Sequence, residues 1–149
     1  MSDIEIEELI KKANNGDREA QYMLAQCYFK GDGVEKNFVE AVKYYKLSAD
    51  QDYSLAQNAL GYCYHLGLGV EKDVKTAFIL YTKAASDELP KAYFNIGLCY
   101  ERGDGVESDI YDALYAYRLA AERGHLTAQY RLGSIYYNGI RVEKDYYEA

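Results

Sequence analysis

The sequence predicts an all-α solenoid in which helix–turn–helix units follow one another with a 36-residue period. One six-residue segment recurs almost unchanged as GDGVEK, GLGVEK and GDGVES, and its first glycines, Gly31, Gly67 and Gly103, lie 36 residues apart. Apolar residues recur within each unit at the spacing of one helix face. The columns that keep the register are Ala20, Ala56, Ala92 and Ala128; Leu24, Leu60, Ile96 and Leu132; Tyr28, Tyr64, Tyr100 and Tyr136; and Ala41, Ala77, Ala113 and Ala149.

The first helix of a unit is predicted over Arg18–Lys30, where Ala20 and Leu24 lie on the apolar stripe. Gly31 follows at the position where a left-handed residue commonly ends a helix. Gly33 then permits a second tight reversal of the backbone, which a Cβ atom would hinder. The glycine-rich segment is therefore interpreted as the turn between two helices.

The second helix of the unit is predicted over Phe38–Asp50, with Asn37 as its N-cap and Ala41 and Tyr45 on its apolar stripe. A phosphate-binding loop is excluded because no strand pattern precedes the glycines and no Lys-Ser/Thr pair follows them. A calcium loop is excluded because its carboxylates would have to recur, whereas Asp32 is replaced by leucine in the second copy.

The pattern A-x-x-x-L-G-x-x-Y, then G-x-G-V, an Asp and A-x-x-x-Y-x-x-A-A resembles the Sel-1-like repeat family, a branch of the tetratricopeptide-like helical repeats. The segment AQNALGYCYHLGLGVEKDVKTAFILYTKAA matches nearly throughout, and the resemblance covers Ala20 to Ala149. It implies a right-handed α-solenoid, and members of the family are mostly adaptors that bring other proteins together. The chain departs from the pattern at Ala25, a glycine in later units, and at Arg141, where the second turn glycine is expected.

We interpret residues 1–149 as one solenoid without a second domain. Its predicted parts are an N-terminal capping helix at 1–16, full repeats at 20–55, 56–91 and 92–127, and a partial fourth repeat at 128–149 that turns at Gly139. Ala149 aligns with the first stripe residue of a second helix, so we expect Tyr146, Tyr147 and the preceding helix to leave apolar surface uncovered. Two explanations stay open: a fragment of a longer array, which we favour, and self-association through this end.

Composition restricts the partners. The net charge is −7 and no basic stripe is present, which argues against nucleic acid. No apolar run approaches the length of a membrane span, and the segment MSDIEIEELIKK lacks the basic and apolar regions of a signal peptide, so we expect a cytoplasmic protein.

Cys27, Cys63 and Cys99 share one column, and stacked helices would hold their Cα atoms about 10 Å apart, too far for a disulfide. We expect three free, buried thiols.

The candidate binding surface is the face of the first helices opposite their buried stripe, because its columns vary while the core columns repeat. Such faces usually line the concave side of a solenoid, and aromatic residues favour binding hot spots. The predicted partner-binding residues are Tyr22, Gln26, Phe29, Asn58, Tyr62, His65, Phe94, Leu98, Glu101, Tyr130, Ser134 and Tyr137. We therefore expect an adaptor that binds a protein or peptide and needs no cofactor or metal. The alternative is drift at exposed positions in a chain rich in tyrosine.

Catalysis is not predicted. The two histidines, His65 and His125, belong to no cluster with the spacing of zinc ligands. Cys63 and His65 lie two residues apart on a helix and face different directions, so they cannot form a nucleophile–base pair. We expect His65 on the surface of the groove and His125 between helices, near an N-cap. The alternatives are a small hydrolase or ligand-binding protein of the penicillin-binding branch, whose paired cysteines this chain lacks, and a self-assembling module.

Overall fold

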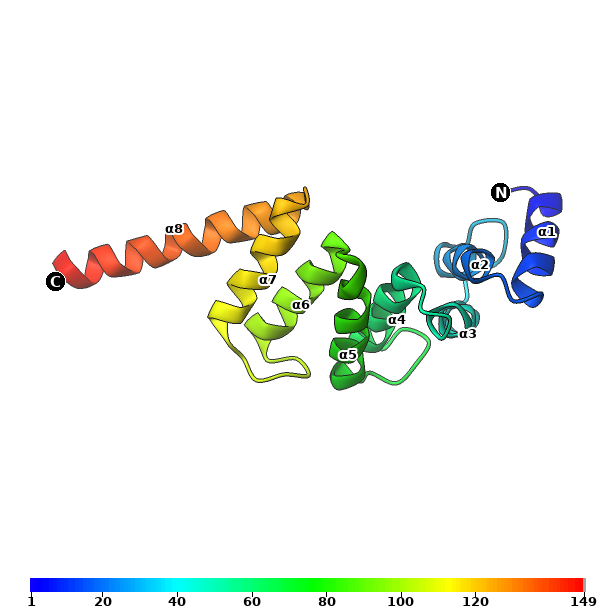
Figure 1. Ribbon diagram of the computed structural model, residues 1–149, viewed down its shortest axis with the longest axis horizontal. Helices are drawn as coiled ribbons and strands as arrows, with labels where there is room; N and C mark the ends of the chain where they lie inside the picture. Colours follow the sequence, from blue (N-terminus) through cyan, green and yellow to red (C-terminus); the bar gives the residue numbers. More distant parts are fainter. Residues whose placement is uncertain (149) are drawn as a thin grey trace.

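The computed structural model describes the backbone of residues 1–148 and the side chains of residues 1–139, and this part of the chain contains no strand. Its elements are α1 (Asp3–Asn14), α2 (Arg18–Lys30), α3 (Phe38–Ala49), α4 (Ser54–Leu66), α5 (Val74–Ala84), the 3-10 helix η1 (Ala85–Asp87), α6 (Pro90–Arg102), α7 (Ile110–Glu122) and α8 (Leu126–Glu148). Each helix packs against the next one along the chain, and the closest pairs are the hairpins α2–α3, α4–α5 and α6–α7. The hairpins follow one another in a row, so the all-α molecule is elongated, with its two ends far apart (Figure 1).

Glycines end the first helix of each hairpin, as the sequence predicts. Gly31, Gly67 and Gly103 adopt the left-handed conformation with φ of 74°, 73° and 74°. The N–H of Gly31 donates to the carbonyl oxygen of Cys27 at 2.8 Å. The next helix then begins at a side-chain cap, since the amide oxygen of Asn37 accepts the N–H of Glu40 at 3.1 Å.

The second glycine of the second and third turns lets each of these turns dock on the hairpin before it. A Cβ atom at Gly105 would lie 2.2 Å from the carbonyl oxygen of Val74, and one at Gly69 would lie 2.4 Å from that of Phe38. No side chain is tolerated at such a distance from backbone atoms. These glycines therefore provide close approach between hairpins in addition to a left-handed turn.

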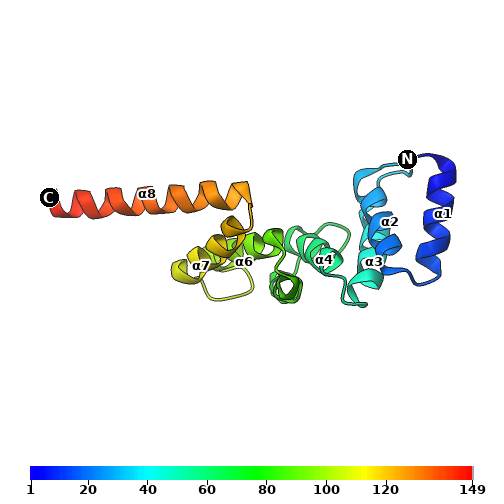
Figure 2. The same ribbon diagram turned by 45° about the horizontal axis from the view of Figure 1, so that its top comes forward.

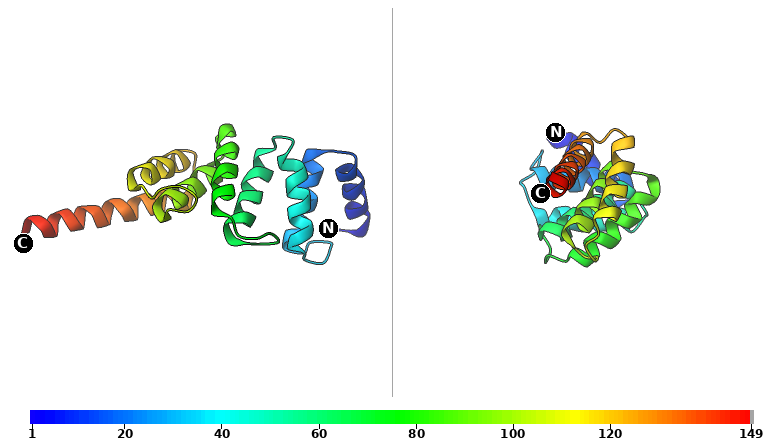
Figure 3. Two further views of the ribbon diagram at one scale, coloured as in Figure 1. Left: turned by 90° about the horizontal axis from the view of Figure 1, so that it is seen from below. Right: turned by 90° about the vertical axis from the view of Figure 1, so that its left-hand side faces the viewer.

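The fourth unit differs from the sequence-based prediction, which was wrong about a turn at Gly139. The backbone continues as one helix from Leu126 to Glu148, and the second half of α8 projects beyond the other helices (Figures 2 and 3). The docking glycine of the other turns is replaced here by Arg141, and a side chain at that position cannot make the backbone approach that Gly105 makes.

Part of the expectation for this end lies outside the described residues, namely Ala149 and the side chains of Tyr146 and Tyr147. Within the described part, α8 presents apolar surface. Leu126 is 77% exposed and Tyr130 is 79% exposed.

A buried tyrosine from the second helix occupies the core of each hairpin. The three rings are at most 2% exposed and belong to Tyr45, Tyr81 and Tyr117. Tyr117 lies so close to α6 that a Cβ atom at Gly97 would be 2.4 Å from its Cε1 atom. In the first hairpin the equivalent position is Ala25, which is fully buried. The residues of the first helices that face the tyrosine rings are therefore small, and this leaves room for the rings.

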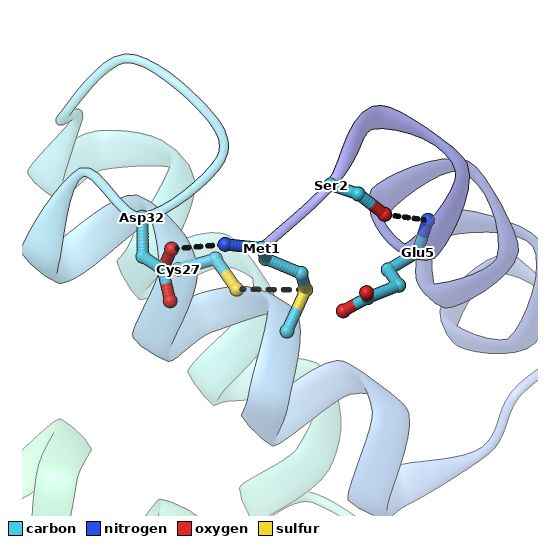
Figure 4. Close-up of polar contacts among 5 residues, drawn as sticks. All are labelled: Met1, Ser2, Glu5, Cys27 and Asp32. Atoms are coloured by element: carbon cyan, nitrogen blue, oxygen red, sulfur yellow. Dashed lines mark hydrogen bonds and ion pairs between the residues drawn. The ribbon is translucent and has the colours of Figure 1, made fainter.

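Helix α1 lies at the N-terminal end of the array and buries Ile6, Leu9 and Ala13, and its role as a cap stays a prediction. Its own N-cap is Ser2, whose hydroxyl oxygen accepts the N–H of Glu5 at 3.2 Å (Figure 4).

Met1, two residues before α1, adds a polar contact to the first turn. The ammonium nitrogen of Met1 lies 2.8 Å from a carboxylate oxygen of Asp32, which raises the pKa of that ammonium above its usual value (Figure 4). The Met1 sulfur lies 3.9 Å from the Cys27 sulfur. Cys27, Cys63 and Cys99 are all free and buried, and burial raises the pKa of the Cys63 thiol to about 11, as expected of unreactive core cysteines.

Substituting Gly97→Ala is expected to destabilise the protein by about 1–3 kcal/mol, because the new methyl group collides with the Tyr117 ring. Gly133→Ala is the matched control in the same column of the repeat. A Cβ atom there meets nothing within 4 Å, so this change is expected to stabilise helix α8 by up to about 1 kcal/mol. Urea unfolding of both variants measures the difference, and equal stabilities would contradict the proposed packing.

Candidate functional site

The first helices of the hairpins line a continuous hollow, which we call the groove. Its larger cavity, of about 380 Å³, lies between α2, α4, α6 and the start of α8. A second cavity of about 300 Å³ continues from it beside the start of α6 and the turn before α8. Six of the predicted residues line the larger cavity: Tyr22, Gln26, Phe29, Asn58, Tyr62 and Phe94.

The other six predicted residues line neither cavity. Leu98 is half-buried on α6, and Tyr130, Ser134 and Tyr137 are exposed on α8. His65 and Glu101 face the interior of the hairpins, as described below. The structure therefore brings together half of the predicted surface.

Sequence reasoning missed several groove residues. Leu55, Lys91 and Thr127 belong to a single column of the repeat that varies as strongly as the predicted ones, and Asn95 and His125 also line the larger cavity. The variation of that first column was the available signal. It was overlooked because the column lies beside, and not opposite, the buried stripe.

The end of the groove at α2 is uncharged and held by hydrogen bonds. The amide nitrogen of Gln26 donates to the Tyr22 hydroxyl at 2.6 Å, and the Tyr45 hydroxyl donates to the Gln26 amide oxygen at 2.7 Å. The Tyr22 ring also packs on Tyr53, with ring centres 5.5 Å apart. Burial raises the pKa of Tyr22 and of Tyr45, so both hydroxyls stay protonated.

The middle of the groove contains a pair of amides. The Asn95 Nδ2 atom donates to the Asn58 Oδ1 atom at 3.0 Å, which joins α6 to α4. Among the described residues, the Asn58 amide nitrogen and the Asn95 amide oxygen have no further hydrogen-bond partner. One donor and one acceptor group therefore remain available to a ligand, and these are the groups that a peptide main chain needs.

The end of the groove at α8 is formed by His125, which confirms its predicted place near an N-cap. Its Nδ1 atom accepts the N–H of Ala128 at 3.1 Å, so the ring itself caps α8. The ring stacks on Phe94, with centres 4.6 Å apart and planes at 20°. Burial and the nearby positive charge of Lys91 lower the pKa of His125, and the neutral ring keeps the cap.

The prediction that His65 lies on the groove surface was wrong. The residue is only 7% exposed, with Nδ1 3.1 Å from the Tyr81 hydroxyl and Nε2 2.8 Å from a carboxylate oxygen of Asp104 in the next turn. The buried Tyr81 hydroxyl needs a partner, and His65 is the polar residue within its reach. The three residues resemble a catalytic relay in composition, but the histidine and tyrosine are buried and no groove cavity opens onto them.

Glu101 also bonds to a buried tyrosine hydroxyl, and this bond explains why its side chain is turned away from the groove. The Tyr117 hydroxyl donates to a carboxylate oxygen of Glu101 at 3.2 Å, and Arg131 of α8 forms an ion pair with the same oxygen. This carboxylate therefore joins α6, α7 and α8, and does not face the groove.

No group of three His, Cys, Asp or Glu side chains within the described residues could hold a metal ion. None of the described helices has both the length and the apolar character needed to cross a bilayer. The groove itself offers aromatic rings for stacking and amide groups for hydrogen bonding.

Tandem helical hairpins that dock through their turns define a helical-repeat protein. The chain belongs to the Sel1 repeat family, whose repeats match residues 18–53, 54–88, 90–125 and 126–149. A 45-residue segment is 47% identical to DAP3-binding cell death enhancer 1 of Rattus norvegicus, covering 30% of this chain and 9% of that protein. The chain thus spans less than a tenth of that relative.

Solved structures of similar proteins agree with this assignment. A protective antigen of uropathogenic Escherichia coli strains, described as having an SLR fold, has a TM-score of 0.84 and 37% identity, covering 90% of this chain and 29% of that one. A Sel1 repeat protein from Oxalobacter formigenes has a TM-score of 0.82 and 38% identity, covering 90% and 55%. Cysteine rich protein B of Helicobacter pylori has a TM-score of 0.68 at 17% identity, covering 85% and 93%, which shows a shared fold alone.

We expect His65→Phe to destabilise the protein by about 1–3 kcal/mol, because it leaves the buried Tyr81 hydroxyl without a partner. The ring itself is expected to fit, since Phe29 holds the equivalent position in the first hairpin. Adding Tyr81→Phe should recover most of the loss by removing the orphaned hydroxyl. Urea unfolding of the two single variants and the double variant gives the coupling energy. Additive losses would contradict the assigned bond.

Acid is expected to weaken the cap of α8. The pKa of His125 in the folded protein lies below its usual 6.5, so the unfolded chain binds more protons between the two values, and stability falls as pH drops below about 6.5. His125→Asn keeps a capping side chain that does not titrate. Thermal unfolding between about pH 7.5 and 5.5 should therefore show a larger loss for the parent protein than for His125→Asn. Parallel pH profiles would rule out this role of His125.

Proposed function

We propose that the protein is an interaction scaffold that binds an extended segment of a partner protein in the groove. The observation that carries the proposal is the Asn58–Asn95 amide pair in a groove with aromatic walls. Sel1 repeat proteins are commonly protein-interaction scaffolds, which supports the same conclusion.

The groove provides the two elements of peptide recognition at low entropic cost. Its aromatic rings are already fixed before binding, Phe94 by stacking on His125 and Tyr22 by its bonds to Gln26. Fixed rings offer contact area without ordering many rotamers. The amides between them suit the N–H and C=O groups of a main chain, and the rings provide contact area for its side chains.

Three finer features belong to the same proposal. We propose a right-handed solenoid with a 36-residue unit, and we propose that it works in the cytoplasm. The free thiols of Cys27, Cys63 and Cys99 support the location, because reducing compartments preserve unpaired cysteines.

A library of random peptides displayed on phage tests the proposal. Peptides selected on the parent protein are expected to lose at least about tenfold in affinity for a Tyr62→Ala, Phe94→Ala double variant, since aromatic hot spots contribute about 1–2 kcal/mol or more each. Tyr111→Ala, Tyr115→Ala is the matched control, because it removes two exposed aromatic rings outside the groove. Circular dichroism confirms folding, and Tyr62→Ala alone replaces the double variant if Phe94→Ala unfolds. Equal loss in the control, or none in the groove variant, would exclude the groove.

A further inference from the structure

The groove is free of carboxylates although the protein is acidic. The chain has 24 aspartates and glutamates against 17 lysines and arginines. None of these acidic residues lines either cavity of the groove, within the part of the chain whose side chains are described. The charged residues that do line the cavities are Lys91 and Arg123. The sign of the charge in the groove is therefore opposite to that of the protein as a whole.

Arg123 is already neutralised by the protein. Its guanidinium donates to a carboxylate oxygen of Glu88 at 3.0 Å and to the carbonyl oxygen of Leu119 at 3.0 Å, and it lies over the Tyr93 ring, 5.1 Å from the centre. These contacts hold it in place as part of the α7–α8 turn. It is not the group that determines the charge of the groove.

Lys91 supplies the charge that is not compensated. It is exposed on the first turn of α6, lines both cavities, and has no carboxylate within ion-pair distance among the described residues. The neighbouring His125 is kept neutral by burial and by this same charge, so it contributes no positive charge of its own. The equivalent positions in the other units are Glu19, Leu55 and Thr127, so the repeat fold does not require a lysine here.

We propose that the segment bound in the groove is acidic, with an Asp or Glu side chain that pairs with Lys91 and an adjacent apolar side chain that packs on Leu55 and Phe94. This inference rests on the proposed function and specifies the class of partner. The carboxylate belongs to an internal residue of the partner, and not to its C-terminus, because the groove continues on both sides of Lys91. Phe94 and Tyr62 lie on one side and Leu89 and Pro90 on the other.

Charge reversal in the same phage selection tests the inference. The displayed peptides are fused to the coat protein at their C-terminus, so they carry no free terminal carboxylate. The parent protein should enrich peptides with Asp or Glu beside an apolar residue, and Lys91→Glu should enrich Lys or Arg at that position. For synthetic peptides with amidated C-termini, Lys91→Glu should weaken the parent-selected sequence by roughly fivefold or more, whereas Lys91→Arg should retain it.

The outcomes separate this inference from the function on which it rests. If the selected peptides depend on Tyr62 and Phe94 but show no acidic preference, or if parent and Lys91→Glu select the same sequences, the acidic segment is refuted and the groove function stands. If amidated peptides fail to bind while the same peptides with a free C-terminus bind, the internal carboxylate is refuted. If neither the groove variants nor Lys91→Glu affects binding, both proposals fail.

Discussion

The packing of one buried tyrosine against the inside of the neighbouring helix determines the rest of this structure. Tyr81 and Tyr117 lie against Gly61 and Gly97 more closely than a methyl group would permit, so the two helices of a hairpin approach at a residue without a side chain. A tyrosine placed so deeply brings its hydroxyl to the first helix of its own hairpin. That hydroxyl must find a polar partner there, because an orphaned buried group costs about 1–3 kcal/mol. Each hairpin therefore uses one polar side chain of its first helix for its own core: Gln26, His65 and Glu101.

The contact between hairpins also depends on glycines, which have no side chain. Gly69 and Gly105 bring each turn against the backbone of the preceding second helix, and Asp104 adds a bond from its turn to His65. The tyrosine network and the docking of the turns are thus joined through one histidine. In the fourth unit Arg141 stands in place of this glycine, and the described backbone continues as one helix from Leu126 to Glu148.

These constraints explain how much could be predicted from the sequence. Helix limits, turn glycines, caps and buried columns follow from local rules and recur in register, so they were predictable. The groove was predictable only in part, because a variable column does not reveal whether its residue faces a ligand or completes a core hydrogen bond. His65 and Glu101 do the latter, and their role depends on a tyrosine hydroxyl that is 16 residues away in the sequence. Lys91 lines the groove although its column of the repeat lies beside, and not on, the helix face that was predicted to bind a partner.

The residues that line the groove do not follow the repeat symmetry of the core. The core repeats nearly the same tyrosine, glycine and alanine in each hairpin, whereas the column of Asn58 contains Tyr22 and Phe94 in its neighbouring units. The Asn58–Asn95 amide pair lies between an uncharged aromatic end and an end that carries Lys91. A ligand that shifted by one repeat would place its apolar and polar groups against the wrong partners. Under the proposed function, this asymmetry fixes both the register and the direction of the bound segment, which is the condition for selecting one segment among many.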